Sequence, residues 1–291
     1  MNATPAQFPQ EAQAERIFFA APKPWGKWSL RAVAAVYLGV MIILPLTALL
    51  EHGLRDGVTV LWRDLSSPIA FAALRLTLLT AVVMTAINAV MGTLTAYVLV
   101  RYRFFGNSLL NSLIDLPFAI PTLVTGVMLV VLYGPQQVLG AWLEARGVQI
   151  IFAQPGIVLA LLFVTYPFVI RTVQPVLMEI DQSQEEAAWT LGASPWRTFR
   201  EIILPAIRPA VLTGALLSFA RALGEFGSIV IVAGNIPRST LTAPVYIFGQ
   251  IESQNQCGAS AMSLVLLALS FALMMFVDWM QERQGGSHGV D

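Results

Sequence analysis

The sequence predicts an all-α membrane protein with six transmembrane helices, and its composition and apolar stretches are the observations that predict it. Only 12% of the 291 residues are charged and 56% are hydrophobic, whereas a soluble domain carries about 25% charged residues. A transmembrane helix needs roughly 20 consecutive apolar residues. Charge-free stretches of about this length occupy 32–50, 76–100, 116–143, 147–170 and 253–277, and only Arg221 and Glu225 interrupt a sixth at 209–233.

The first apolar stretch follows a Pro- and Ala-rich segment, residues 1–30, which we expect to be a cytoplasmic N-terminal tail. A cleaved signal peptide is the alternative, but the apolar stretch is long for such a signal and the polar tail before it is also long. Residues 31–280 then form the transmembrane domain, and residues 281–291 form a cytoplasmic C-terminal tail.

The distribution of Lys and Arg predicts the orientation of these spans. With the N-terminus inside the cell, ten of these residues fall in inner segments and five fall in outer loops. An excess of Lys and Arg marks the cytoplasmic side. Both termini are therefore expected in the cytoplasm, together with the polar segment 183–209 between the fourth and fifth spans.

The third stretch begins with DLPFAIPTLVTG, in which Pro117 and Pro121 follow Asp115. Proline lacks a backbone donor and clashes with the preceding turn, so we expect a kinked or broken span. A break at membrane depth needs protein or a water-filled cavity to cover it. The alternative is a continuous helix that begins late, at Pro117.

The segment 183–209, SQEEAAWTLGASPWRTFREIILPAIRP, predicts a short helix followed by a glycine turn. Ser183 and Glu186 have the spacing of a capping box, with Ser183 as the N-cap. The helix then extends over 184–191, and Gly192 suits the left-handed conformation just beyond its end.

A second helix is expected directly after this turn. Ser194 can be its N-cap, and Pro195 occupies the first helical position, where the missing N–H costs nothing. Trp196, Phe199 and Ile203 then lie on one face. The alternative interpretation of the whole segment is an amphipathic linker at the membrane surface.

The fifth stretch contains Arg221 and Glu225, which share one face of a continuous helix and can pair. Gly224 and Gly227 leave room for a neighbouring helix. This face either lines a translocation path or its gate, or it fixes helix packing only. Arg171 likewise lies near the inner mouth of a path or extends to the cytoplasmic surface. The candidates for the path or gate are Arg171, Arg221, Gly224, Glu225 and Gly227, with Pro117 and Pro121.

Several classes of function find no support in the residues. The formal net charge is zero, which argues against a nucleic-acid partner. Cys257 is the single cysteine, so no intramolecular disulfide can form, and the two histidines lie far apart in sequence. No G-x-x-x-x-G-K-[ST] phosphate loop is present, so we expect no ATP hydrolysis on this chain. The single cysteine and the two distant histidines form no metal-binding cluster in the sequence, so we expect no metal on this chain, and we expect no cofactor of its own.

The stretch EAAWTLGASPWRTFREIILP resembles the EAA loop of the permease subunits of binding-protein-dependent ABC importers. The matching positions are Glu186, Ala187, Ala188, Gly192, Ile202, Leu204 and Pro205. The resemblance implies the type I importer permease fold, which is also called MetI-like. It also implies that this loop contains a coupling helix that docks in a groove of an ATPase subunit.

Further stretches resemble the sulfate/thiosulfate permeases of the CysT type within this family. They are RYRFFG, DLPFAIPTLVTG, YPFVIRTVQPVL, FARALGEFGSIVIVAGNIP and VYIFGQIES, and they cover the chain from about residue 70 to residue 280. The segment ESQNQCGAS departs from the family pattern, which leaves contacts with a binding protein open.

This closer resemblance implies import of sulfate or thiosulfate across the bacterial inner membrane. The implied partners are a CysA-like ATPase dimer that binds ATP and Mg, a CysW-like permease or a second copy of this chain, and a periplasmic sulfate/thiosulfate-binding protein. Molybdate permeases share the EAA loop and GEFG, so a molybdate or tungstate importer stays open. An ATP-independent channel or secondary transporter is a more distant alternative.

Overall fold

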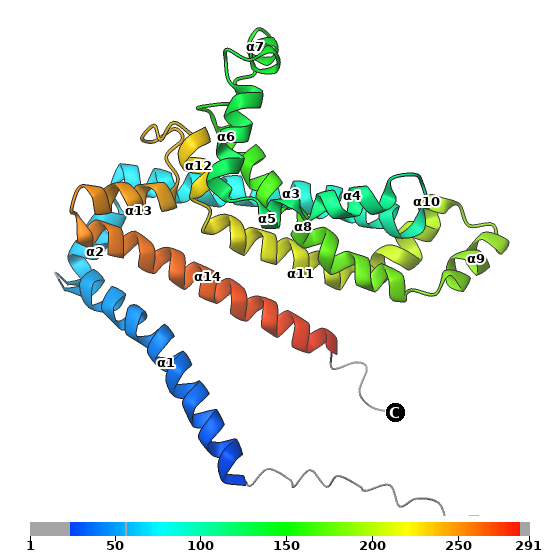
Figure 1. The fold of residues 1–291 in the computed structure, drawn as a ribbon, viewed down its shortest axis with the longest axis horizontal. Coiled ribbons are helices and arrows are strands. Elements are labelled where there is room, and N and C mark those ends of the chain that lie inside the picture. Colours follow the sequence, from blue (N-terminus) through cyan, green and yellow to red (C-terminus); the bar gives the residue numbers. More distant parts are fainter. Residues whose placement is uncertain (1–23, 56, 286–291) are drawn as a thin grey trace, which may run out of the picture. The chain divides into compact units, whose positions relative to one another are not determined.

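The computed structural model describes residues 24–55 and 57–285, and every regular element in these ranges is helical (Figure 1). The chain divides into two units, Met1–Ala48 and Leu49–Asp291. The long helices are α1 (Pro24–Leu54), α3 (Pro68–Arg101), α8 (Gln154–Glu179), α11 (Leu204–Leu223) and α14 (Gln256–Gly285). The short helices are α2 (Val58–Leu65), α4 (Asn107–Ile114), α5 (Leu116–Ala119), α6 (Thr122–Tyr133), α7 (Val138–Glu144), α9 (Gln182–Thr190), α10 (Pro195–Thr198), the π-helical η1 (Phe199–Ile203), α12 (Gly227–Val232) and α13 (Ala243–Glu252).

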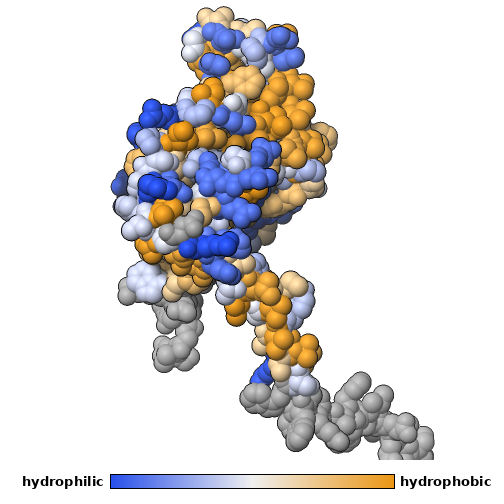
Figure 2. All heavy atoms as spheres, turned by 90° about the vertical axis from the view of Figure 1, so that its left-hand side faces the viewer, coloured by the Kyte–Doolittle hydropathy of each residue, from blue (hydrophilic) through white to orange (hydrophobic). Residues whose placement is uncertain are grey.

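Five helical segments in the described part of the chain are long and apolar enough to cross a membrane, and a bent pair of helices adds a sixth. This confirms the prediction of an all-α membrane protein. Figure 2 views the end of the second unit that carries α2 and α13, where hydrophilic residues gather beside a hydrophobic flank. Helix α1 begins at Pro24, inside the expected tail, and α14 continues to Gly285, beyond the expected boundary at residue 280.

The centre of the second unit is formed by α3, α8 and α11, which pack along one another. Asn88 on α3 donates to Thr165 Oγ1 on α8 at 2.8 Å, and further along both helices Arg101 donates to the carbonyl of Ile180 at 3.4 Å. These two contacts show that α3 and α8 are parallel. A Cβ at Gly214 of α11 would lie 2.2 Å from Thr172 Oγ1, so α11 and α8 approach closely because that side chain is absent.

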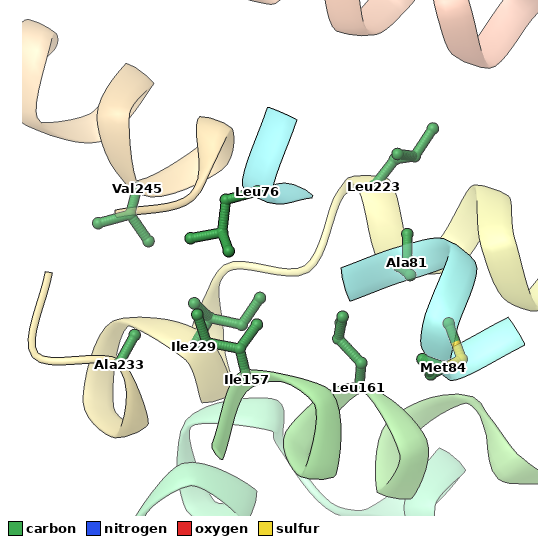
Figure 3. Packing of buried hydrophobic residues seen from close by; sticks show 10 residues of the cluster. Leu76, Ala81, Met84, Ile157, Leu161, Leu223, Ile229, Ala233 and Val245 are labelled. Carbon is green, nitrogen blue, oxygen red and sulfur yellow. The ribbon is translucent and has the colours of Figure 1, made fainter. Parts of the chain in front are cut away.

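The largest buried cluster joins the N-terminal halves of α3 and α8 and the C-terminal end of α11 to α12 and α13 (Figure 3). Leu76 of α3 and Leu223 of α11 belong to it, as do Ile157 of α8 and Val245 of α13. The apolar contacts of these side chains therefore hold α12 and α13 against the bundle, close in sequence to Arg221.

The third span is broken, as the proline pair predicts. The helices α4 and α5 meet α6 at a bend of 113°, and Ile120 between them has extended backbone, with φ −84° and ψ 126°. Pro121 explains this conformation, because a proline disfavours the helical region for the residue before it. The predicted extent, 116–143, is wrong. The helical segment begins at α4, and the apolar run is divided among α5, α6 and α7.

Candidate functional site

The first helix of the polar segment, α9, begins two residues earlier than predicted. Its N-cap is Asp181, whose carboxylate accepts the backbone N–H of Ser183 at 2.9 Å. The prediction that Ser183 is the N-cap is therefore wrong, because the preceding aspartate provides an equally good cap and starts the helix at Gln182. The hydrogen bonds from Ser183 also lower the pKa of Asp181. Glu186, the fifth residue of this helix, is exposed.

The turn after α9 has the geometry that the glycine predicts. Gly192 has φ +84°, its N–H donates to the Trp189 carbonyl at 2.9 Å, and the N–H of Ala193 donates to the Ala188 carbonyl at 3.0 Å. These two bonds form a Schellman motif, which closes the helix and requires a left-handed residue. Ser194 then accepts the N–H of Arg197 at 3.3 Å and caps α10.

A π-helical turn, η1, connects α10 to the fifth span. The N–H of Leu204 donates to the Phe199 carbonyl, one residue further back than in an α-helix. Pro205 explains the wide turn, since it has no N–H and its ring displaces the carbonyl four residues before it. The prediction that Trp196, Phe199 and Ile203 lie on one face of a helix is only partly correct. Ile203 is buried, whereas Trp196 is 69% exposed and stacks on the partly buried Phe199.

The surface of this segment is rich in small and apolar side chains. Ala187 is exposed, Ala188 is half-buried, and Leu191 is 88% exposed beside the glycine turn. Of the last three positions of the EAA pattern, Ile202 is partly buried, while Leu204 and Pro205 are exposed. An exposed apolar patch of this kind on a short helix is typical of a protein contact surface.

A buried ion pair attaches α9 to α3, and the sequence analysis missed it. Arg101 Nη2 lies 2.6 Å from Glu185 Oε1, and the two side chains are only 8% and 5% exposed. The acidic pair Glu185–Glu186 and Arg101, the first residue of RYRFFG, were both visible in the sequence. Which of the two glutamates faces α3 depends on how α9 is rotated, and the sequence pattern does not give that rotation.

The second candidate site surrounds Glu225, which is buried at 1% exposure of its side chain. Its Oε2 lies 2.8 Å from Nη2 of Arg221, whose side chain is 36% exposed. Its Oε1 accepts the backbone N–H of Ser228 at 2.9 Å and the Ser228 hydroxyl at 2.8 Å. The predicted pairing of Arg221 with Glu225 is therefore present, and the same carboxylate also binds the first turn of α12.

The expectation that Arg221 and Glu225 share a face of one continuous helix is wrong. Helix α11 ends at Leu223, and the chain passes through Gly224 and Phe226 before α12 begins at Gly227. The carboxylate of Glu225 lies between the two helices, where it accepts from Ser228. The apolar stretch 209–233, which the sequence predicts as one span, is thus interrupted between α11 and α12.

The broken third span contacts α12 through glycine. A Cβ at Gly227 would lie 2.2 Å from Thr122 Oγ1, and a Cβ at Gly126 would lie 2.8 Å from the Ser228 carbonyl. Helix α6 therefore packs backbone to backbone against α12, directly after Pro121. At Gly224 a Cβ would have no atom of this chain within 4 Å, so no helix in the described part of the chain fills the space that this glycine leaves.

Arg171 binds the end of α4, and its expected place near the inner mouth of a path or at the cytoplasmic surface stays a prediction. Its Nε donates to Asp115 Oδ1 at 2.7 Å, and its Nη2 donates to Asp115 Oδ2 at 2.5 Å. Nη1 donates to Asn111 Oδ1 at 3.0 Å and to Gln174 Oε1 at 2.6 Å, and Nη2 also donates to the Asn111 carbonyl at 2.8 Å. All five donors of the guanidinium are engaged. Arg171 thus fixes α4 and the start of the broken span, next to Pro117, against α8.

Comparison with known proteins identifies the family. A family model described as "binding-protein-dependent transport system inner membrane component" matches residues 88–285. The chain belongs to this family. Its members are permease components of ABC transporters and are not themselves enzymes. They are multi-pass membrane proteins that work with an ATPase, a binding protein and a permease partner.

Two relatives have sequences similar to nearly the whole chain. The chain is 44% identical over 250 residues to the "probable sulfate transport system permease protein cysT" of Nephroselmis olivacea, covering 86% of this chain and 88% of the relative. It is 39% identical over 259 residues to the "sulfate transport system permease protein CysT" of Synechocystis sp., covering 89% and 88%.

Solved structures support the fold of type I ABC importer permeases. A chain of a bacterial alginate ABC transporter, solved in complex with an alginate pentasaccharide-bound periplasmic protein, is 17% identical. It superposes with a TM-score of 0.75 over 89% of this chain and 94% of that chain. A chain of an amino acid ABC transporter is 20% identical and has a TM-score of 0.52 over 75% of this chain and 94% of that chain.

Proposed function

We propose that this chain is the permease subunit of an ABC importer in the bacterial inner membrane and forms the transmembrane path for sulfate or thiosulfate. The observation that supports the importer mechanism best is α9 with its glycine turn. This short helix is exposed, closed by a Schellman motif, and adjacent to the ends of α3 and α8. The sulfate substrate is supported by the relatives of the CysT type, which are similar over most of the chain.

In the proposed mechanism, α9 docks in a groove of an ATPase subunit, as amphipathic helices bind apolar grooves elsewhere. Ala187 and Ala188 allow the groove to approach the backbone, and Glu186 contributes an exposed charge at the contact. Gly192 and Pro205 set the direction in which the segment leaves and re-enters the membrane domain. ATP and Mg²⁺ bind the CysA-like ATPase subunits, so movement of those subunits would displace α9.

The anion path is proposed to pass Arg221. Its guanidinium is partly exposed, and the buried Glu225 offsets much of its charge. A fixed cation of reduced strength attracts an anion without binding it tightly, and transport requires such weak binding because the ion must leave again. The breaks at Pro121 and at Gly224–Phe226, joined by the contact at Gly227, place irregular backbone beside this position. Arg171 is excluded from anion binding in this proposal because its donors are already engaged.

The proposed complex contains two permease subunits and separates capture from passage. The second permease is a CysW-like subunit or another copy of this chain, and a periplasmic sulfate/thiosulfate-binding protein delivers the anion. In the membrane orientation that the Lys and Arg distribution predicts, both termini and the segment 183–209 face the cytoplasm. A C-terminal enzymatic tag that reports topology should therefore be active in the cytoplasm, and activity in the periplasm would contradict the orientation.

Uptake of radiolabelled sulfate tests the proposed function. Cells that lack their own sulfate permease would express this chain with its ATPase, binding-protein and permease partners, with or without excess unlabelled thiosulfate or molybdate. Uptake that thiosulfate blocks and molybdate leaves unchanged is the expected result. An assembled complex that accumulates molybdate and no sulfate would replace the substrate by the molybdate alternative. Uptake that persists without the ATPase would contradict the importer mechanism itself.

A further inference from the structure

Helix α9 is attached to the membrane domain in an unusual way. Glu185 is its single buried residue, and its other side chains are exposed or half-buried. A helix that packs on a protein normally does so through an apolar stripe. Here one carboxylate replaces that stripe, so the attachment of α9 depends on the partner of that carboxylate.

The partner, Arg101, connects three elements. It is the last residue of α3, and its Nη2 lies 2.6 Å from Glu185 Oε1 of α9. The same nitrogen donates to the carbonyl of Ile180, which follows α8, at 3.4 Å. In Figure 1, α9 lies at the end of the bundle where α3 and α8 terminate. Removing either charge would leave the other buried and unpaired, which is strongly unfavourable.

The contact between the Arg101 guanidinium and the Glu185 carboxylate is a close approach of charges and not an aligned hydrogen bond. Buried Arg101 Nε has no hydrogen-bond partner in the described part of the chain, and Glu185 Oε1 faces Nη2 without the alignment of a hydrogen bond. A hollow of about 350 Å³, lined in part by Trp189 and Tyr97, lies beside the pair. The attachment of α9 therefore depends on the two opposite charges and not on an aligned hydrogen bond, and burial opposes their separation.

Helix α3 reaches from this pair to the region of the second candidate site. It packs along α8 and α11 over its length. At its outer end Leu76 belongs to the same buried cluster as Ala222 and Leu223, the two residues after Arg221. A displacement of the inner end of α3 is therefore passed through packed side chains to the neighbourhood of Arg221.

We propose that the Arg101–Glu185 pair transmits displacement of α9 to α3, so that both residues are positioning residues for transport. The inference rests on the proposed function, in which the ATPase moves α9. When α9 is displaced, α3 follows, because the alternative is a buried carboxylate without its cation. The apolar contacts of α3 then convey the movement toward Arg221.

The first test measures coupling in proteoliposomes that contain the whole complex with its ATPase and binding protein. The variants are Arg101→Gln, Glu185→Gln and the exchange Arg101→Glu with Glu185→Arg. The control is Arg103→Gln, which removes an exposed charge two residues away. We expect each single variant to keep the ATPase bound and to lower sulfate transported per ATP hydrolysed about tenfold or more, since one buried charge is left unpaired. The exchange should recover at least part of this ratio, and the control should match the wild type.

Single variants that keep the wild-type ratio would overturn the proposal. So would single variants that lose the ATPase and are not rescued by the charge exchange, since the pair would then have only a folding role. Recovery in the exchange variant would distinguish a role in transmission from a role in folding alone, because the exchange restores the ion pair with reversed polarity.

A second measurement does not depend on the substrate. Spin labels at Arg103→Cys and Ser183→Cys, in a Cys257→Ser background, report the distance between α3 and α9 in the complex with and without ATP. We expect a narrow distance distribution that ATP leaves unchanged, and a broad or ATP-dependent one after Glu185→Gln. Equal distributions in both proteins would contradict the transmission role. If the wild-type complex moves no sulfate but shows these distances, the substrate assignment fails and the transmission role stands.

Discussion

Replacing Gly227 by alanine should push α6 of the broken third span away from α12, and its effect can be worked out from the contact between these two helices. The added Cβ would lie 2.2 Å from Thr122 Oγ1, and 3.1 Å from both Thr122 Cβ and Leu123 N. Two of these three atoms belong to the Thr122 side chain and the third is backbone, so rotation of Thr122 alone cannot relieve the overlap. Overpacking of a tight contact costs about 1–3 kcal/mol. We expect that loss of stability, together with reduced uptake, because α6 must move away from α12, whose first turn is bound by Glu225.

Thermal unfolding of the purified complex in detergent and sulfate uptake in cells are the two assays. The matched control is Gly224→Ala in the same break, where the added Cβ meets no atom within 4 Å and φ is −96°, which alanine adopts without strain. Adding Thr122→Ala to Gly227→Ala removes the nearest atom and should recover part of the stability. If Gly227→Ala is as stable and as active as Gly224→Ala, the packing of α6 on α12 described above is wrong.

Three further changes test the loop and the path. Glu186→Lys should abolish uptake while the amount of inserted protein stays normal, because it reverses the exposed charge on the docking face; unchanged uptake would remove α9 from the ATPase contact. Arg221→Ala leaves Glu225 buried without its cation, so transport or assembly should fall, and wild-type levels of both would show the pair to be dispensable. The Ser183 hydrogen bonds lower the pKa of Asp181, so this cap stabilises α9 above the unfolded pKa near 3.9 and is lost as pH falls through the lower folded value. Asp181→Asn should keep the cap and remove this pH dependence, as measured by hydrogen exchange of the first α9 amides; an unchanged dependence would assign it to another group.

The features that the sequence predicts correctly are local ones. The glycine turn at Gly192 and the cap at Ser194 follow from backbone rules that involve residues within a few positions of each other. The break before Thr122 follows from Pro121 in the same way. The error at Ser183 has a local cause too, since Asp181 and Ser183, two positions apart, were both competent caps and Asp181 is the one that the helix uses.

The arrangement of the charged residues depended on the tertiary structure. Arg171 binds Asp115, 56 residues away, and Arg101 binds Glu185 on a helix that begins about 80 residues later. A charged side chain within the membrane domain pairs with whichever opposite charge the fold brings within about 4 Å, because it cannot remain unpaired out of water. Apolar periodicity indicates which segments are buried and contains no information about those partners.

By itself the sequence predicted the class of the protein, the approximate places of its apolar spans and the polar segment with its EAA pattern, because hydropathy, capping and proline effects act over short distances along the chain. Only the tertiary structure decided that Glu185 and not Glu186 faces α3, that Glu225 lies between α11 and α12 and binds Ser228, and that the broken third span meets α12 at Gly227. These outcomes depend on how helices rotate and approach one another, and that is fixed by packing among residues distant in sequence.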